Sequence, residues 1–397
     1  MSLTRRQFLY TTTALSLGAA SSASDRSGTV LVVLQLAGGN DGLNTVVPYE
    51  DDHCGRARTT LRLTGSQVHK IGSSLGLHPE MNGFARLFAE GRLAILQGVG
   101  YPKMLRDHNT GMRAWQTASL SAQEQTGWIG RIADRDADHI PAAYVGTIAP
   151  PFSIHAREAI VPQLHSAADW AFAGNPPEPS AAQRPDALAS FAARTTADAF
   201  AKVRNVSEAL RRPAVIQYPQ LPLAQSLQSV AQLIRADLGI RIFLVEQGGV
   251  SPGEFDNHAN QAVNHAVSLR ELSASVTAFC DDIEKDRLSD RVLLMTYSEF
   301  GRTLTENGRH GTGHGAAAPV FLAGGAIRPG LIGNHPSLTD LDADAPKPHT
   351  DFRSLYAAVL DDWLSIPADP ILGGHFEKVS ILGTRSEPPR ARIAAND

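Results

Sequence analysis

Cysteine, basic segments and long apolar runs are all scarce in this chain. Its two cysteines, Cys54 and Cys280, lie far apart in the sequence, which excludes a disulfide-dense scaffold and a thiolate metal framework. Cys280 lies in an apolar helical pattern, so we expect a buried free thiol there. The net charge of −4 leaves no basic surplus, and we therefore expect no nucleic-acid partner. Beyond the N-terminus, no apolar run approaches the length of a membrane span.

The N-terminus has the order of features of an export signal. The segment Thr4–Leu9 contains the pair Arg5-Arg6 and resembles a twin-arginine signal. A modest apolar stretch follows, and then the small residues 21–23, which suit signal peptidase. An arginine pair that caps an ordinary first helix is the alternative. We expect residues 1–24 to engage the twin-arginine export machinery and the mature protein to be periplasmic or secreted.

Apolar runs and helical spacing alternate along the rest of the chain. This alternation predicts an α/β fold, with a doubly wound, mostly parallel sheet sandwiched by helices. We expect a single domain over residues 25–397, with a helical, proline-rich insertion at about 150–220. The expected strands are 29–36, 92–99, 142–145, 240–246, 291–297 and 319–323, and the expected helices are 79–91, 108–118, 128–136, 185–211, 221–238, about 258–287 and 351–364.

Acids and histidines follow the predicted strands. Because the carboxyl ends of parallel strands share one edge of a sheet, these side chains should gather there. Each also has a simpler interpretation: an ordinary N-D-G turn, a helix cap, or a salt bridge between Glu299 and Arg302. The residues concerned are Asp41 after the first strand, Asp107 and His108 after the second, Asp256 and His258 after strand 240–246, and Glu299 with Arg302 after strand 291–297.

A histidine pair, His310 and His314, lies in a glycine-rich loop that leads into strand 319–323. Histidines flanked by glycine seldom serve packing, so ligation and a flexible loop are the two interpretations. Carboxylate and imidazole ligands suit zinc and manganese alike. Three acids and three histidines are enough for two cations that share a bridging ligand. We therefore expect one or two divalent cations (zinc, manganese or calcium).

Motifs that extend from end to end of the mature chain carry a family resemblance. They are L-Q-L-A-G-G-N-D-G-L-N-T-V-V-P (34–48), L-G-L-H-P (75–79), L-A-I-L-Q-G-V-G-Y-P (93–102), T-G-W-I-G-R (126–131), F-D-N-H-A-N-Q (255–261), Y-S-E-F-G-R-T (297–303), H-G-T-G-H-G (310–315) and H-T-D-F-R-S-L-Y (349–356).

With these motifs the chain resembles the domain-of-unknown-function 1501 family. More distantly, the order of its elements is similar to that of the alkaline phosphatase/sulfatase superfamily, which implies an alkaline phosphatase-like fold. The resemblance implies metal ligation by Asp41, by Asp256 and His258, by Glu299 and by His314.

Two positions depart from the superfamily pattern. Phe300 stands where a histidine ligand is usual, and Asp107-His108 stands where the family tends to carry Ser-His. A hydroxyl nucleophile is therefore missing from its expected place, and Thr110 is the substitute candidate.

Two functions are compatible with these residues. The first is an exported, metal-dependent hydrolase of small-molecule phosphate or sulfate esters. Its cation would polarise the ester oxygen and activate Thr110 or water, Arg302 would stabilise charge on the oxygens, and His108 would protonate the leaving group. The second is an inactive metal- or anion-binding or assembly protein of the cell envelope on the same fold. A nucleophile facing the metals would favour the first, and an Asp107 cap that seals the helix would favour the second.

Overall fold

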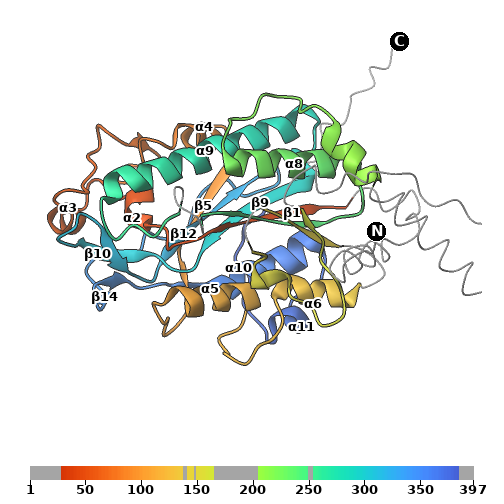
Figure 1. Ribbon diagram of the computed structural model, residues 1–397. Helices are drawn as coiled ribbons and strands as arrows, with labels where there is room; N and C mark the ends of the chain where they lie inside the picture. The colour runs from red at the N-terminus through yellow and green to blue at the C-terminus, as the bar shows by residue number, and fades with distance from the viewer. Residues whose placement is uncertain (1–27, 137–140, 147–148, 165–203, 249–253, 384–397) are drawn as a thin grey trace, which may run out of the picture.

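The computed structural model describes residues 28–136, 141–146, 149–164, 204–248 and 254–383. A nine-stranded sheet lies between two layers of helices (Figure 1). Within the described residues, β12 alone runs antiparallel to its neighbours in this sheet, and the other pairs are parallel. The strands lie in the order β13 (Gly330–Ile332), β5 (Leu93–Gly100), β12 (Ala318–Ala323), β9 (Val292–Ser298), β1 (Val30–Leu36), β8 (Ile242–Gln247), β6 (Ala142–Val145) and β7 (Gln163–Leu164), and β16 (Thr350–Asp351) also pairs with β5.

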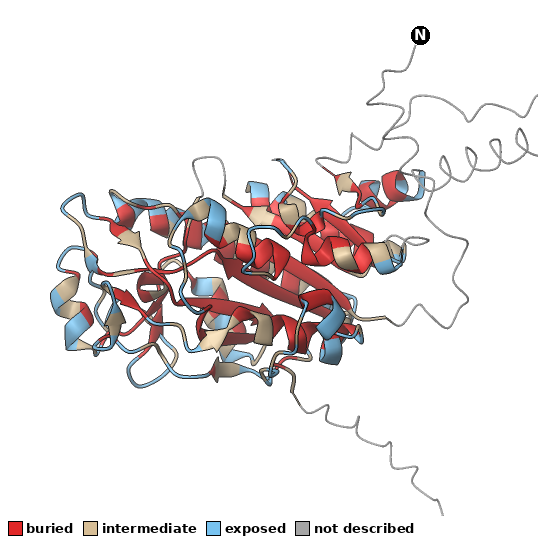
Figure 2. Ribbon diagram, turned by 90° about the horizontal axis from the view of Figure 1, so that it is seen from below, coloured by how far each residue is buried: buried red, intermediate tan, exposed pale blue. Residues whose placement is uncertain are grey.

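The central strand β1 shows why the sheet is covered on both faces. All seven of its residues are buried, as expected for a continuous apolar strand inside a doubly wound sheet. Val30, Val32 and Leu34 pack into one core, and Leu31 and Val33 pack into the other, because successive side chains point to opposite faces. Figure 2 shows the sheet as a continuous buried layer.

Different helices cover the two faces of the sheet (Figure 1). One core includes buried residues of α4 (Asn82–Ala89), α8 (Pro222–Ala236) and α9 (Gln261–Lys285). The opposite core includes residues of α5 (His108–Thr117), α6 (Trp128–Arg135), α10 (Phe352–Ala358) and α11 (Asp369–Leu372). The expected sandwich, with a mostly parallel sheet between helices, is confirmed.

Smaller elements gather at one end of the molecule, where Figure 1 labels α2, α3, β10 and β14. The short strands among the smaller elements form two-stranded and three-stranded sheets beside the large one. These smaller elements are α2 (Gly42–Thr45), α3 (Asp52–Ala57), β2 (Val46–Val47), β3 (His69–Lys70), β4 (Gly76–Leu77), β10 (Arg302–Glu306), β11 (Thr312–His314), β14 (Leu341–Asp342) and β15 (Ala345–Pro346).

Other short helical segments lie elsewhere in the chain. They are the 3-10 turns Phe152–Ile154 and Ser289–Arg291 and the π-helical segment Val359–Leu364, which continues α10.

The predicted strands all form, and the helices differ mainly at their ends. The helix expected from about 258 begins at Gln261, because the preceding residues form the loop that carries Asp256 and His258. The predicted signal at 1–24 lies outside the described residues, as does most of the helix predicted at 185–211.

Both cysteines are buried and unpaired, which confirms the buried free thiol expected at Cys280. Among the helices of the described residues, none has the length and apolar character needed to cross a bilayer.

Candidate metal centre

The direction of β12 explains how the histidine loop reaches the ligand edge. β1, β5, β8 and β9 run parallel, so the segments that follow them emerge at one edge of the sheet. β12 runs the opposite way and therefore begins at that edge. The loop that precedes β12 carries His314, which thus meets side chains that follow the parallel strands.

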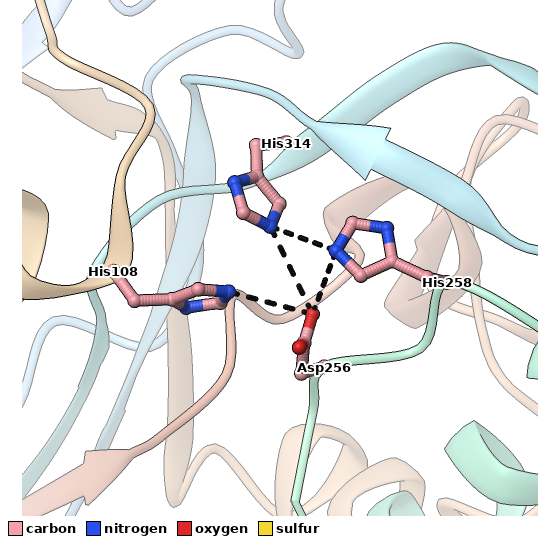
Figure 3. Close-up of side chains that lie close together, drawn as sticks. All are labelled: His108, Asp256, His258 and His314. Atoms are coloured by element: carbon pink, nitrogen blue, oxygen red, sulfur yellow. Dashed lines mark hydrogen bonds and ion pairs between the residues drawn. The ribbon is translucent and has the colours of Figure 1, made fainter.

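Four side chains converge at this edge: His108, Asp256, His258 and His314 (Figure 3). One potential ligand atom from each lies within 4.8 Å of all the others. The Oδ1 atom of Asp256 lies 3.1 Å from His258 Nε2, 3.5 Å from His108 Nε2 and 3.9 Å from His314 Nε2. His258 Nε2 and His314 Nε2 lie 2.8 Å apart.

The second nitrogen of each imidazole determines which nitrogen faces the centre. His258 Nδ1 donates to the carbonyl of Thr312 at 2.8 Å, and His314 Nδ1 donates to the carbonyl of Arg106 at 2.8 Å. His108 Nδ1 donates to Glu299 Oε1 at 2.9 Å. In the neutral imidazoles the Nε2 atoms therefore carry lone pairs rather than protons. Metal-binding histidines are oriented in this way in proteins.

When all three imidazoles are neutral, their lone-pair nitrogens and the carboxylate oxygen repel one another unless a cation lies between them. Zinc at about 2.0–2.1 Å from tetrahedral ligands places those ligands about 3.3–3.5 Å apart. The four ligand-atom distances of 2.8, 3.1, 3.5 and 3.9 Å scatter around that value. The donor set therefore fits one tetrahedral divalent cation.

Electrostatics keep two of the imidazoles neutral. Burial, together with the nearby positive charge of Arg302, lowers the pKa of His258 and of His314 below the usual histidine value. The hydrogen bond to Glu299 raises the pKa of His108. Burial alone would raise the pKa of Asp256, but Arg302 outweighs it and holds this pKa below the usual range. The carboxylate of Asp256 is thus ionised and available as a ligand.

The side chain of Arg302 contacts protein groups on all sides. Its side chain is fully buried, and its donors are directed to protein acceptors rather than to an open site. Nε donates to the carbonyl of Gly39 at 2.7 Å, and Nη2 reaches Asp256 Oδ1 at 2.7 Å and the carbonyl of Gly38. Nη2 also donates to Phe255 and Nη1 to Thr312. Arg302 therefore positions a candidate ligand in this structure, and the oxyanion-holding role stays a prediction from the sequence.

Glu299 lies behind His108 rather than among the four converging residues. Its Oε1 accepts from His108 and, at 2.8 Å, from the backbone N–H of Gly38, and its Oε2 lies 3.0 Å from Ser298 Oγ. The side chain is 2% exposed. Glu299 therefore orients a candidate ligand in this structure.

Asp41 also lies outside the group of four. It caps α2 by accepting from the N–H groups of Leu43 and Asn44. Its other oxygen accepts from Arg58 at 2.7 Å and from Gln261. Burial opposes ionisation, but Arg58 and the hydrogen bonds keep the pKa of Asp41 lowered. Its carboxylate thus forms a buried ion pair.

His310 and Thr110 are also directed elsewhere. His310 is exposed, and its Nδ1 lies 3.2 Å from Thr60 Oγ1, so it is not part of the group. The hydroxyl of Thr110 donates to Asp107 Oδ1 at 3.1 Å, and Asp107 also accepts from the Thr110 N–H as the N-cap of α5. The capping interpretation of Asp107 is therefore confirmed.

Sequence reasoning assigned His108 to proton transfer and missed its place among the candidate ligands. A signal was present, since His108 opens the helix that follows a parallel strand. Which of its nitrogens faces inward depends on Glu299, which is distant in sequence, and no local pattern contains that information.

The family described as "Protein of unknown function (DUF1501)" matches residues 189–362, which confirms the family resemblance over the part of the chain that holds the last four motifs. No curated protein matches the chain.

Several solved structures are similar to this chain at low identity. One is the C-terminal periplasmic domain of EptC from Escherichia coli in complex with Zn, at 9% identity and a TM-score of 0.39, covering 75% of this chain and 73% of that chain. Another is the lipoteichoic acid synthase LtaP from Listeria monocytogenes, at 9% identity and a TM-score of 0.38, covering 80% of this chain and 72% of that chain. A third is the alkaline phosphatase of the Antarctic bacterium TAB5, at 11% identity and a TM-score of 0.36, covering 75% of this chain and 92% of that chain.

Proposed function

We propose that this chain, which matches the DUF1501 family over residues 189–362, is an exported metal-dependent hydrolase of phosphate or sulfate esters. One observation carries the proposal: three imidazoles, each with its Nδ1–H held by an acceptor, turn their Nε2 atoms toward one carboxylate oxygen. The N-terminal segment 1–24 would direct export through the twin-arginine machinery.

The cation we propose is a single zinc ion held by His108, Asp256, His258 and His314. Nitrogen ligands and a near-tetrahedral spacing favour zinc over calcium, which prefers six to eight oxygen ligands. We propose no second cation, because Asp41 and Glu299 lie outside the group of four converging residues. Asp41 forms a buried ion pair with Arg58, and Glu299 accepts from His108 and Gly38.

When bound, zinc supplies Lewis acidity that polarises an ester oxygen and lowers the pKa of a nucleophile beside it. The chain's own residues prepare the site. Glu299 orients His108, the carbonyls of Thr312 and Arg106 orient His258 and His314, and Arg302 keeps Asp256 ionised. The nucleophile we propose is water, because the Thr110 hydroxyl is engaged by Asp107.

The same engaged hydroxyl supports a second candidate, a metal-binding or assembly protein without hydrolytic activity. Phe300 adds to it, since its ring packs against His108 and His314, with centroids 5.0 Å and 4.6 Å away, where the superfamily has a ligand histidine. Metal binding is common to both candidates, and turnover separates them.

The first experiment is elemental analysis of protein purified without chelator, for wild type, His314→Gln and His310→Gln. Both variants lose an imidazole from the same loop, but only His314 is among the four converging residues. We expect about one equivalent of zinc in wild type and in His310→Gln and little in His314→Gln. Folded wild type that stays metal-free in added zinc would contradict the proposal.

Zinc-loaded wild type is then assayed with 4-nitrophenyl phosphate and 4-nitrophenyl sulfate, with His314→Gln as the blank. Turnover in wild type alone supports the hydrolase. Full zinc occupancy without turnover of any phosphate or sulfate ester in a broad panel supports the metal-binding protein.

A further inference from the structure

A cavity of about 410 Å³ is lined in part by the chain segments that lead to His108 and follow His314. Its volume is within the range of small-molecule sites. Tyr101, Pro102, Met104 and Pro348 supply apolar lining. The charged and polar residues of the wall are Lys103, Arg106, Lys347, His349, Thr350, Asp342 and Asp351.

Both acids in the wall are paired with arginines. Asp342 pairs with Arg106 at 2.8 Å, and Asp351 pairs with Arg353 at 2.7 Å while it caps α10. The cavity therefore offers little free negative charge to a ligand.

The two lysines of the wall are available to a ligand. Among the described residues, no carboxylate lies within salt-bridge distance of Lys103, which is exposed. Lys347 pairs with Asp340, but the two side chains are 47% and 72% exposed, and pairs of this kind contribute little free energy. The cavity thus combines an apolar wall with two ammonium groups that can face an anion.

The cavity and the metal centre share two chain segments. Arg106 lines the cavity, its carbonyl holds His314 Nδ1 at 2.8 Å, and His108 follows two residues later. Ala316 lines the cavity two residues after His314. An ester group at the metal centre would therefore have this cavity as a neighbour on the side formed by these two segments.

We infer that this cavity binds the alcohol part of the ester, and that this part consists of an apolar body with an anionic group of its own. The inference rests on the proposed hydrolase. Lys103 and Lys347 would bind the anionic group, and Tyr101 and Met104 would contact the apolar body. Substrates with a second negative charge would then be preferred over simple esters.

The test uses the alcohol alone, so that it does not depend on turnover. The probes are 6-hydroxynaphthalene-2-sulfonate and its uncharged counterpart 2-naphthol, titrated by fluorescence into the full-length zinc-treated protein. The variants are Lys103→Gln/Lys347→Gln, which removes two positive charges from the cavity wall, and, as a control, Lys285→Gln, which removes one positive charge at the C-terminal end of α9. Zinc content is measured on every sample.

We expect wild type and Lys285→Gln to bind the sulfonate about tenfold or more tightly than 2-naphthol, and the double variant to bind both equally. Equal affinities in wild type, or a preference that survives in the double variant, would overturn the inference. The proposed hydrolase function is tested by other measurements. It is contradicted if the protein binds no zinc or turns over no ester, whatever the affinities for the sulfonate and 2-naphthol.

Discussion

Histidines in this chain differ in what their second ring nitrogen contacts. The three imidazoles of the candidate metal centre each donate a hydrogen bond from Nδ1 to an oxygen of the protein. His265 instead is fully buried, its Nε2 lies 2.9 Å from Asn40 Oδ1, and its Nδ1 has no hydrogen-bond partner within the described structure. Burial lowers the pKa of His265 to about 3, and that of the neighbouring His78 to about 4. These two histidines are suited to stay neutral inside the fold.

The buried histidines predict acid sensitivity. Because their folded-state pKa values lie below the unfolded value of 6.5, the unfolded chain binds more protons as the pH falls below 6.5. Each histidine then lowers the free energy of unfolding by about 1.4 kcal/mol per pH unit until its folded pKa is reached. Urea titrations at pH 7 and pH 5 measure how much free energy of unfolding is lost between the two pH values. We expect this loss to be about 2 kcal/mol smaller in His265→Gln than in wild type. An identical loss in both proteins would contradict the assignment.

Arg302 is predicted to be a structural requirement of the centre. In Arg302→Lys, the shorter ammonium cannot serve Gly39, Phe255 and Asp256 together, so buried acceptors are left without donors. We expect a loss of about 3 kcal/mol or more in the free energy of unfolding, measured in urea.

The control for Arg302→Lys is Arg270→Lys, in which an exposed arginine pairs with Glu80. Its stability should be unchanged. Equal stability of the two variants would show that the buried contacts of Arg302 contribute nothing.

Thr110 gives a prediction about mechanism. If water is the nucleophile, Thr110→Ala should keep kcat for 4-nitrophenyl phosphate or sulfate, because the hydroxyl only supports the Asp107 cap. Loss of a true nucleophile lowers kcat on the order of 10³-fold or more. A loss of that size in Thr110→Ala, with zinc content intact, would restore Thr110 as the nucleophile.

At the scale of elements, β5 and β12 show how the edge of the sheet is shaped. Their ladder shifts register between Ala318 and Val320. Opposite this irregularity, Gly98 has a φ of +63°, and a Cβ there would lie 2.1 Å from His349 Nε2, which itself lies 2.8 Å from the carbonyl of Asn334. The close approach of His349 requires glycine at this position.

Gly98→Ala is therefore predicted to be more costly than an ordinary glycine substitution. The matched control is Gly239→Ala, where φ is +82° and nothing lies within 4 Å of the added Cβ. We expect the control to lower the free energy of unfolding by about 1–2 kcal/mol, from backbone strain alone. Gly98→Ala should lose about 3 kcal/mol or more, because steric displacement of His349 is added. Equal losses in chemical denaturation would contradict the close contact.

At the scale of the whole molecule, the two cores share one sheet. Val32 and Leu34 of β1 pack into one core, and Leu31 and Val33 pack into the other. Neither layer of helices can lose its contacts without exposing the same strands. This arrangement favours unfolding of the described part as one unit.

Zinc should stabilise that unit by mass action. At about 100 times its Kd, a ligand that binds only the folded state adds about 2.7 kcal/mol. Calorimetry should show one transition whose Tm rises by about 5 °C in zinc and falls again in chelator. His310→Gln should respond in the same way as wild type, and His314→Gln should not. Two separate transitions would contradict the shared sheet, and an unmoved Tm in wild type would contradict the zinc site.

Much of the fold could be predicted because its signals are local. The run 29–36 predicts a strand buried on both faces, and the structure confirms it as β1, Val30–Leu36. Parallel strands also explain why Asp256 and His258 could be assigned to one edge before their contacts were known. Asp41, Thr110 and Arg302 were harder to assign, because an acid, a hydroxyl or a guanidinium can bind a ligand or a neighbouring protein group equally well.

By itself the sequence determined the order of strands and helices, the loops that carry acids and histidines, and the family resemblance. All of these depend on residues close together in the chain. Only the tertiary structure decided that β12 runs antiparallel, that Arg58 engages Asp41, and that Glu299 turns His108 inward. These outcomes depend on contacts between segments that are distant in sequence, and burial makes such contacts strong enough to decide which polar groups remain free to bind a ligand.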